Sequence, residues 1–422
     1  MSTAFFPPEG VDRKRRPWYT DAGFSRAIPA FLRAVAGEKR SERNVIRMDF
    51  SALTAYVDSI PSLGVPGCDL AVYRDHEMIY RRMAGCRDEA GREPMRGDET
   101  YCLYSCTKVF TTCAAMQLIE RGLLHLDDPV SRYLPAYAEM QVREGDALRP
   151  ARREMTIRHI MSMQSGMTYD LATPEIKKAL EETGGLADTR RLVDAKALDP
   201  LNFDPGEDFL YSASHDVLAA VIEVISGQRF SEYLEEHIFA PLGIRGMSFS
   251  VKDLSRQCAQ FVYDGEKDAF EPCARDANSY RLSPLYESGG AGLVGSVADY
   301  ITFTDALACG GKSREGRQIL SPEMMQLWSA NQLGPRARKS FDAWNRKGYS
   351  YALGVRTRVD NTLGGSGAVG EFGWDGAAGA WTMIDPHHHL SAFYGMHVRN
   401  YGYSYDVIHP TLRSLIYEGL GI

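Results

Sequence analysis

Ser105 and Lys108 are the residues whose types and spacing point most directly to chemistry. A helical pattern of apolar residues begins near Ser105 and ends near Arg121, so these two side chains share one helix face. A serine hydroxyl is a poor nucleophile until a base lies beside it. A lysine can be that base only if its pKa falls by roughly three units, and the positive end of a helix disfavours the ammonium form. The pair therefore predicts nucleophilic catalysis, with free N–H groups at the helix start to bind an oxyanion.

The same spacing has a simpler interpretation, in which Ser105 caps a helix and Lys108 points into solvent. A Ser-x-x-Lys pair is expected about once by chance in a chain of this length, and this chain contains one. Cys106 is a rival nucleophile, but its sequence neighbourhood offers no histidine partner, and we rank it below Ser105. The choice depends on whether other segments complete a catalytic site.

Two further segments could complete such a site. Tyr211 lies where an apolar helix over residues 214–226 is expected to begin, and its phenol could relay a proton between Lys108 and a leaving group. The alternative is that Tyr211 only packs at the start of that helix. Residues 370–379 are rich in glycine and contain Trp374. Such a stretch either lets a backbone approach a substrate carbonyl or forms a tight turn around a core aromatic residue.

Composition and charge exclude several classes of function. The chain has 422 residues, 44% of them hydrophobic and 24% charged, as is usual for a soluble globular protein. A formal net charge of −7 argues against nucleic-acid and anionic-membrane partners. The N-terminus lacks the pattern of a signal peptide, and no stretch approaches the roughly 18 apolar residues of a membrane span, so we expect a cytoplasmic protein. The eight cysteines contain no Cys-x-x-Cys pair and are expected to be reduced.

Strand patterns gather towards the two ends of the chain, and helix patterns lie between them. The predicted strands span residues 67–73, 78–83, 349–359, 379–385 and 390–398. The predicted helices span residues 49–60, 105–121, 156–163, 214–226, 230–239, 296–307, 322–328 and 411–420. We therefore predict an α/β (α+β) fold, with an antiparallel sheet from both chain ends and a mainly helical inserted domain. The predicted division is an arm over 1–45, a sheet domain of 46–110 and 340–422, and a helical domain over 111–339.

Taken in order, the segments around Ser105, Tyr211 and Trp374 resemble the serine β-lactamase and penicillin-binding-protein superfamily. They are similar in particular to its class C-like branch, which includes family VIII carboxylesterases and related acyltransferases. The likeness spans residues 50–415 and includes family-typical connecting segments at 118–130, 156–160, 165–166, 204–206, 241–243 and 289–299. It implies the β-lactamase/transpeptidase-like fold.

The resemblance implies a role for each matching residue. Ser105 would be the acylated nucleophile, and Lys108 and Tyr211 would form the proton-transfer pair. The backbone N–H groups of Ser105 and Ala377 would form the oxyanion hole, in which one donor is typically worth about 10²–10³ in turnover. The residues that would bind the substrate are Trp374, Gly376, Tyr104 and Ala213.

Two positions depart from the β-lactamase pattern. Where the family has Tyr-x-Asn, this chain has Tyr211-Ser-Ala213, so the amide that contacts the lysine and the substrate's side-chain amide is missing. Where β-lactamases have Lys-Thr-Gly, this chain has Trp374-Asp-Gly376, the Trp-x-Gly form of the esterase branch. An apolar wall suits a neutral ester better than an anion. The residues that could fill the space left by the asparagine are Ser212, Ser214 and His215.

We therefore expect a serine hydrolase that cleaves a carboxylic ester, or transfers its acyl group, through an acyl-serine intermediate. One alternative is a β-lactamase or a D-amino-acid peptidase or amidase on the same fold. Another is a non-catalytic binding protein that retains the fold. The expected partner is a small-molecule ester or amide, and we expect no cofactor. His387, His388 and His389 could form a metal cluster, but adjacent side chains on a hairpin point in different directions, so we expect a solvated turn and no metal.

Overall fold

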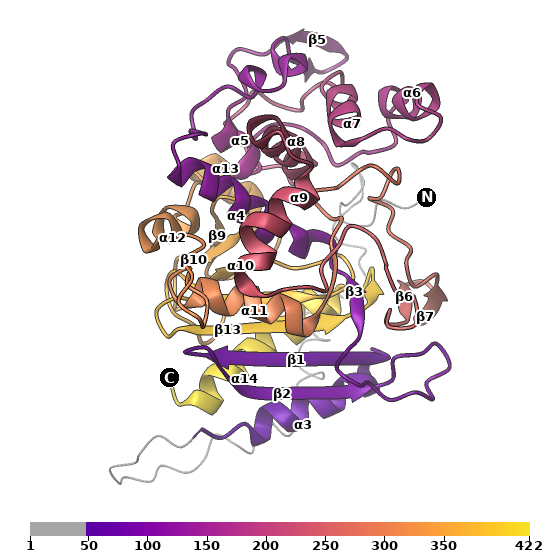
Figure 1. The fold of residues 1–422 in the computed structure, drawn as a ribbon, viewed down its shortest axis with the longest axis vertical. Helices are drawn as coiled ribbons and strands as arrows, with labels where there is room; N and C mark the ends of the chain where they lie inside the picture. The colour runs from indigo at the N-terminus through magenta and orange to yellow at the C-terminus, as the bar shows by residue number, and fades with distance from the viewer. Residues whose placement is uncertain (1–47) are drawn as a thin grey trace.

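The fold is organised around one antiparallel sheet of seven strands (Figure 1). This computed structural model describes residues 48–422, and the predicted arm over residues 1–45 lies outside the described range. The strand order is β2-β1-β13-β12-β11-β10-β9, and β1 pairs with β13 at the junction of the two ends of the described chain. In this order the strands are Glu77–Gly85, Gly67–Arg74, Leu390–Met396, Trp381–Asp385, Phe372–Gly373, Arg356–Arg358 and Tyr349–Tyr351. The predicted sheet from both chain ends is confirmed.

Two terminal helices cover one face of this sheet, α3 (Ser51–Ser59) and α14 (His409–Leu420). Successive side chains of a strand point to opposite faces, so alternate residues of β1 pack on these helices. Leu70 and Val72 of β1 belong to the same buried cluster as Leu53 and Val57 of α3. This part of the core holds the central strands of the sheet against α3 and α14.

The other face packs against α11 (Val297–Ala308), and behind it lie α4 (Thr107–Glu120) and α8 (Ser214–Ser226). Residues 107–118 of α4 are all buried, as expected for a helix enclosed on every side. Phe110 of α4 stacks on Phe303 of α11 with 3.9 Å between ring centres. The remaining α-helices of residues 48–422 are α5 (Ile157–Met161), α6 (Pro174–Glu182), α7 (Thr189–Lys196), α9 (Phe230–Leu234), α10 (Ala240–Leu242), α12 (Pro322–Ser329) and α13 (Pro335–Asp342). The division into a sheet domain and a helical domain stays a prediction.

The structure also contains strands that the sequence analysis missed. They form small sheets: β3 (Thr100–Cys102) with β8 (Val294–Ser296), β4 (Gln141–Glu144) with β5 (Ala147–Pro150), and β6 (Gln260–Asp264) with β7 (Ala269–Cys273) and β14 (Val398–Arg399). Most of them lie within the stretch 111–339 that was expected to be mainly helical, whereas β3 and β14 lie outside it. Such short strands carry too little alternation to be recognised. The single strand predicted over 349–359 is wrong, because Gly354, with a φ of 89°, turns the chain between β9 and β10.

Two other properties follow from the described residues. Within residues 48–422, no helix combines the length and apolar character needed to cross a bilayer. All eight cysteines carry free thiols, in agreement with the predicted reduced state, and Cys106 is among the buried ones.

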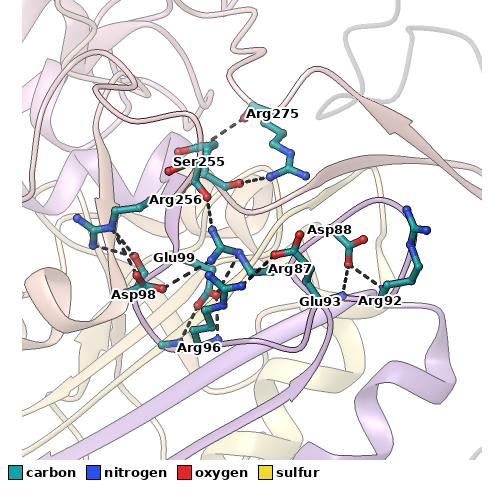
Figure 2. Close-up of polar contacts among 12 residues, drawn as sticks. Arg87, Asp88, Arg92, Glu93, Arg96, Asp98, Glu99, Ser255, Arg256 and Arg275 are labelled. Carbon is teal, nitrogen blue, oxygen red and sulfur yellow. Dashed lines mark hydrogen bonds and ion pairs between the residues drawn. The ribbon is translucent and has the colours of Figure 1, made fainter.

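A network of charged residues anchors the loop that leads into β3 and then to Ser105 (Figure 2). Arg87 is 3% exposed, and its Nε lies 3.6 Å from the Glu99 carboxylate. The same guanidinium donates to the carbonyl of Ser255, which ties the loop to a distant segment. Glu99 also accepts the N–H groups of Arg96 and Gly97 at 2.9 and 2.8 Å. Because a buried ion pair is costly to break, this network fixes the approach to the nucleophile.

Replacing Arg87 with leucine should lower the free energy of unfolding by about 3 kcal/mol, because the Glu99 carboxylate then stays buried without its cation. Arg92→Leu is the control, because that side chain is exposed and only its backbone N–H bonds Asp88. It should change stability by less than about 0.5 kcal/mol. Urea unfolding measures both, and equal midpoints for the two variants would contradict the proposed anchoring.

Candidate active site

Ser105 lies in a single 3₁₀ turn, Tyr104–Cys106, that runs directly into α4. Its side chain is 6% exposed, so it borders the interior and still reaches the surface. Tyr104 has a φ of 46°, a left-handed conformation that non-glycine residues rarely adopt. Directly before this turn, the Leu103 N–H donates a hydrogen bond of 2.9 Å to the carbonyl of Leu293. Ser105 is thus held on a strained backbone that its neighbours keep in place.

The Tyr104 side chain is anchored inside the protein. It is fully buried, and the substrate contact predicted for it from the sequence stays a prediction. Its hydroxyl lies 2.6 Å from Oε1 of Gln260 and 2.8 Å from the carbonyl of Ala277. Both contacts hold the ring inside the protein, so the side chain stabilises the strained backbone before Ser105.

The Lys108 amine is enclosed beside Ser105 and touches uncharged groups. Its Nζ lies 3.3 Å from Ser105 Oγ, 3.1 Å from the Tyr169 hydroxyl and 2.6 Å from the carbonyl of Gly290. Burial lowers the pKa of Lys108 from 10.5 to about 7, against an opposing effect of the Asp216 charge. Near neutral pH a substantial fraction of the amine is unprotonated and can accept the Ser105 proton.

The Tyr211 phenol lies between Ser105 and Trp374. The residue is 2% exposed, and its hydroxyl accepts a hydrogen bond of 2.9 Å from the indole Nε1 of Trp374. Burial raises the pKa of Tyr211 well above its usual value, although hydrogen bonding to Ser105 and Trp374 opposes this effect. Lys108 Nζ lies 4.7 Å from the ring centre, over the face of the phenol. A neutral phenol therefore contacts the serine and faces the lysine, where it can pass a proton between them and a leaving group.

Sequence analysis missed Tyr169, whose hydroxyl bonds Lys108 and whose ring packs 5.7 Å from that of Tyr211. The three residues named as able to fill the space of the missing asparagine have other partners: Ser212 and Ser214 bond each other at 2.7 Å, and Nε2 of His215 lies 3.3 Å from a backbone carbonyl. Tyr169 therefore makes the contact to the lysine that the resemblance assigned to an asparagine. Nothing in the sequence around Tyr169 marks it for this role.

Gly290 was also missed, and a buried carboxylate positions it. Asp216 accepts hydrogen bonds from the hydroxyls of Tyr286 and Ser288 at 2.7 and 2.5 Å, and from the Gly290 N–H at 3.4 Å. The carbonyl of Gly290 in turn accepts a hydrogen bond from Lys108. A Cβ at position 290 would lie 2.5 Å from the Tyr169 hydroxyl, so only glycine fits. The glycine run over residues 289–292 was the signal that could have identified this contact.

A close approach of two backbone segments brings Ala377 towards Ser105. A Cβ on Gly376 would lie 2.5 Å from the carbonyl of Leu103, so glycine is required where the two segments meet. Within residues 48–422, the N–H groups of Ser105 and Ala377 donate to no protein acceptor. Two free donors beside a nucleophile are suited to an oxyanion, and that role for them stays a prediction.

Two arginines hold the segment Trp374–Gly376 in place by bonding its central residue, Asp375. The Asp375 carboxylate accepts hydrogen bonds from Arg356 at 2.8 Å and Arg346 at 3.0 Å. Burial alone would raise the pKa of Asp375, but the two guanidinium groups outweigh it and hold the pKa below its usual value. The acid next to Trp374 is therefore neutralised by these arginines.

Aromatic rings surround the catalytic group. Half-buried Tyr280 lies 5.1 Å from Tyr169, and half-buried Trp344 lies 5.1 Å from Tyr211, as measured between ring centres. Trp374 is 3% exposed and Ala213 only 1%, so Ala213 contributes a methyl group to the core and its predicted substrate contact stays a prediction.

The other predicted candidates do not join this site. Burial raises the pKa of Cys106 well above its usual value, so this enclosed thiol is protonated. Nδ1 of His388 lies 2.6 Å from Asp385, whereas Nδ1 of His389 lies 2.7 Å from Asp75, so neighbouring rings of the hairpin turn to different partners. A separate group in the described chain brings three possible metal ligands within 4.8 Å of one another: His76, Asp305 and Cys309.

Comparisons with known proteins identify the family and the fold. The family model described as beta-lactamase matches residues 49–416. Esterase EstB from Burkholderia gladioli is 29% identical over 372 residues, which cover 80% of this chain and 88% of that protein. Monacolin J acid methylbutanoyltransferase from Aspergillus terreus is 29% identical over 305 residues, covering 68% of this chain and 72% of that protein. A mutant simvastatin synthase from Aspergillus terreus superposes with a TM-score of 0.72 at 25% identity, covering 90% of this chain and 100% of that chain.

The labelling of Ser105 by a fluorophosphonate should rise with pH and reach half its maximum near pH 7. The reason is that Lys108, with a pKa of about 7, accepts the serine proton only when it is uncharged, and it is uncharged above that pH. Rates measured from pH 5 to 9 by intact-protein mass spectrometry test this. A rate that is flat or that falls through neutrality would contradict Lys108 as the base.

Tyr169→Phe should slow this labelling by about tenfold at the pH optimum, because the amine loses a hydrogen-bond partner that orients it. Tyr137→Phe is the matched control: Tyr137 is also buried, but its hydroxyl bonds the carbonyl of Val193. The pH profile separates positioning from general damage, since only Tyr169→Phe should displace its midpoint. Identical profiles for the two variants would reject the role of Tyr169.

Proposed function

The chain belongs to the beta-lactamase family, and from this premise we propose that it cleaves a carboxylic ester, or transfers the acyl group, through an acyl-Ser105 intermediate. The observation that carries the proposal is the buried amine of Lys108, 3.3 Å from Ser105 Oγ and with a pKa of about 7. A lysine that only points into solvent has neither property. The proposed small-molecule substrate accords with the esterase and acyltransferase names of its relatives.

The geometry supports a two-step reaction. Lys108 removes the Ser105 proton as Oγ attacks the ester carbonyl, and the oxyanion that forms accepts hydrogen bonds from the N–H groups of Ser105 and Ala377. The proton passes through the Lys108 and Tyr211 pair to the departing alkoxide, which leaves as an alcohol. Water or a second alcohol then attacks the acyl group, gives up its proton along the same route, and releases Ser105. Hydrolysis and acyl transfer thus differ only in the acceptor.

The surroundings of Ser105 favour a neutral ester over a β-lactam. The indole of Trp374 stands where β-lactamases carry a cation, and the charge of Asp375 is taken up by Arg346 and Arg356. Neither group offers a partner for a substrate carboxylate. The rings of Tyr280 and Trp344 add apolar surface next to the catalytic residues, which suits an uncharged acyl or alcohol group.

Ser105→Ala should lower kcat/KM for a short-chain p-nitrophenyl ester by at least about three orders of magnitude, because the covalent intermediate can no longer form. Cys106→Ala is the control for the neighbouring thiol and should retain most of the activity. Hydrolysis is followed as p-nitrophenol release, and mass spectrometry of quenched wild-type protein should find the acyl group on the Ser105 peptide. Equal rates for wild type and Ser105→Ala would reject the proposal.

The same assay separates the alternatives. A chromogenic cephalosporin turned over faster than the simple ester would favour a β-lactamase or amidase over an esterase. Wild-type protein that neither hydrolyses any ester nor reacts with a fluorophosphonate would favour a binding protein that retains the fold.

A further inference from the structure

A cavity of about 410 Å³ lies beside the N-terminal half of α14, between that helix, the strands β10 and β12, and the loop at residues 345–347. None of the proposed catalytic side chains lines it. Its inner wall consists of buried polar residues, namely Arg356, Asp375, His409 and Arg413. Exposed residues form its mouth, namely Asn345, Lys347, Asp406 and Glu418. This size is typical of a small-molecule site.

Positive charge is concentrated behind the inner wall. The guanidinium groups of Arg356, Arg358 and Arg413 lie 5.5, 5.4 and 5.2 Å from the centre of the Tyr349 ring. All three side chains are buried. Glu371 accepts the Tyr349 hydroxyl at 2.6 Å, and burial raises the pKa of this carboxyl group against the effect of the arginines. One carboxyl group with a raised pKa does not neutralise three buried cations.

Asp375 is a second carboxylate in this region that more than one cation shares. Asp375 bonds both Arg356 and Arg346, so it supplies one negative charge to two guanidinium groups. At the exposed mouth, Lys347 adds a further cation and Asp406 and Glu418 add two carboxylates, so the excess of positive charge is confined to the buried wall. Burying a cation without a counter-charge is costly, so this arrangement favours an anion inside the cavity.

Unsatisfied polar atoms point to the same conclusion. Nε of Arg346 and Nδ1 of His409 line the cavity region, are buried, and have no hydrogen-bond partner among residues 48–422. Nε2 of His409 lies 2.9 Å from the carbonyl of Gly379, which makes Nε2 the donor and leaves Nδ1 as an acceptor. Nδ1 lies 3.7 Å from Oδ1 of Asp375, which already accepts a hydrogen bond from Arg356, so Nδ1 is the acceptor that lacks a donor. The cavity is therefore suited to a ligand with several acceptor oxygens and one hydroxyl group.

We propose that this cavity binds a small molecule with a doubly negative head group, a phosphate monoester or a dicarboxylate. Arg346 and Lys347 make the first contacts, and the buried arginines behind them supply the field that favours a second negative charge. A partly protonated phosphate or an added hydroxyl satisfies the acceptor on His409. The site is distinct from the catalytic one, although Asp375 connects the two because it separates Trp374 from Gly376 in the chain.

The test is isothermal titration calorimetry on the Ser105→Ala protein with inorganic phosphate, phenyl phosphate and phthalate. Saturable binding at one site per chain is expected for at least one dianion, with benzoate binding at least about tenfold more weakly and benzyl alcohol giving no saturation. Phenyl phosphate binding more tightly than phthalate would identify the phosphate source, and the reverse order the dicarboxylate source. Because Ser105 is absent, the result does not depend on whether the protein hydrolyses esters.

Arg346→Gln should weaken binding at least about tenfold, because it removes a charged donor while Arg356 still holds Asp375. Arg336→Gln is the control, since that exposed side chain pairs with Glu207 and Asp208. Thermal unfolding checks that both variants are folded. The proposal is overturned if no dianion gives saturable binding up to about 10 mM, or if folded Arg346→Gln binds as tightly as Arg336→Gln.

Discussion

The rest of the site depends on one constraint, an amine kept inside the protein with neutral partners. The contacts of Lys108 are a hydroxyl of serine, a hydroxyl of tyrosine and a backbone carbonyl. A fall in the pKa from 10.5 to about 7 corresponds to about 5 kcal/mol of disfavoured protonation. Core packing around α4 and α8 must offset this cost. A carboxylate in contact with Nζ would restore the ammonium form, so the acid of this region, Asp216, acts through the backbone of Gly290 instead.

The elements that carry the nucleophile could be predicted because their signals are local. The helix after Ser105 and the helix over 214–226 are each a continuous run rich in apolar residues, and Gly227 ends the second with a φ of 71°. Thr156 caps α5, at the start of the helix predicted over residues 156–163. The resemblance then placed the three catalytic segments in one fold, which no periodicity could do. Short strands such as β4 and β6 escaped prediction, because four or five residues are too few to show a clear period.

What escaped prediction within the site is long-range in the chain. The contact between Lys108 and Tyr169 joins residues 61 positions apart, and that with Gly290 joins residues 182 apart. A sequence reveals the type of such residues but not which of many tyrosines or glycines the folded chain brings to the amine. The structural contacts of Tyr104 are long-range as well. The sequence revealed neither its positive φ nor the hydrogen bond of its hydroxyl to Gln260.

A phenol in place of the asparagine amide explains how the chain can lack that amide and still position Lys108, the proposed base. An amide serves two partners, the lysine on one side and a substrate amide on the other. The Tyr169 hydroxyl replaces the first contact, and because burial raises its pKa well above the usual value, it stays neutral and does not stabilise the ammonium form of Lys108. The second contact has no replacement at Ala213, whose side chain is a methyl group. Proton transfer from Ser105 therefore remains available, while the polar contact that would select an amide substrate is absent from that position. This asymmetry favours ester chemistry independently of the tryptophan at position 374.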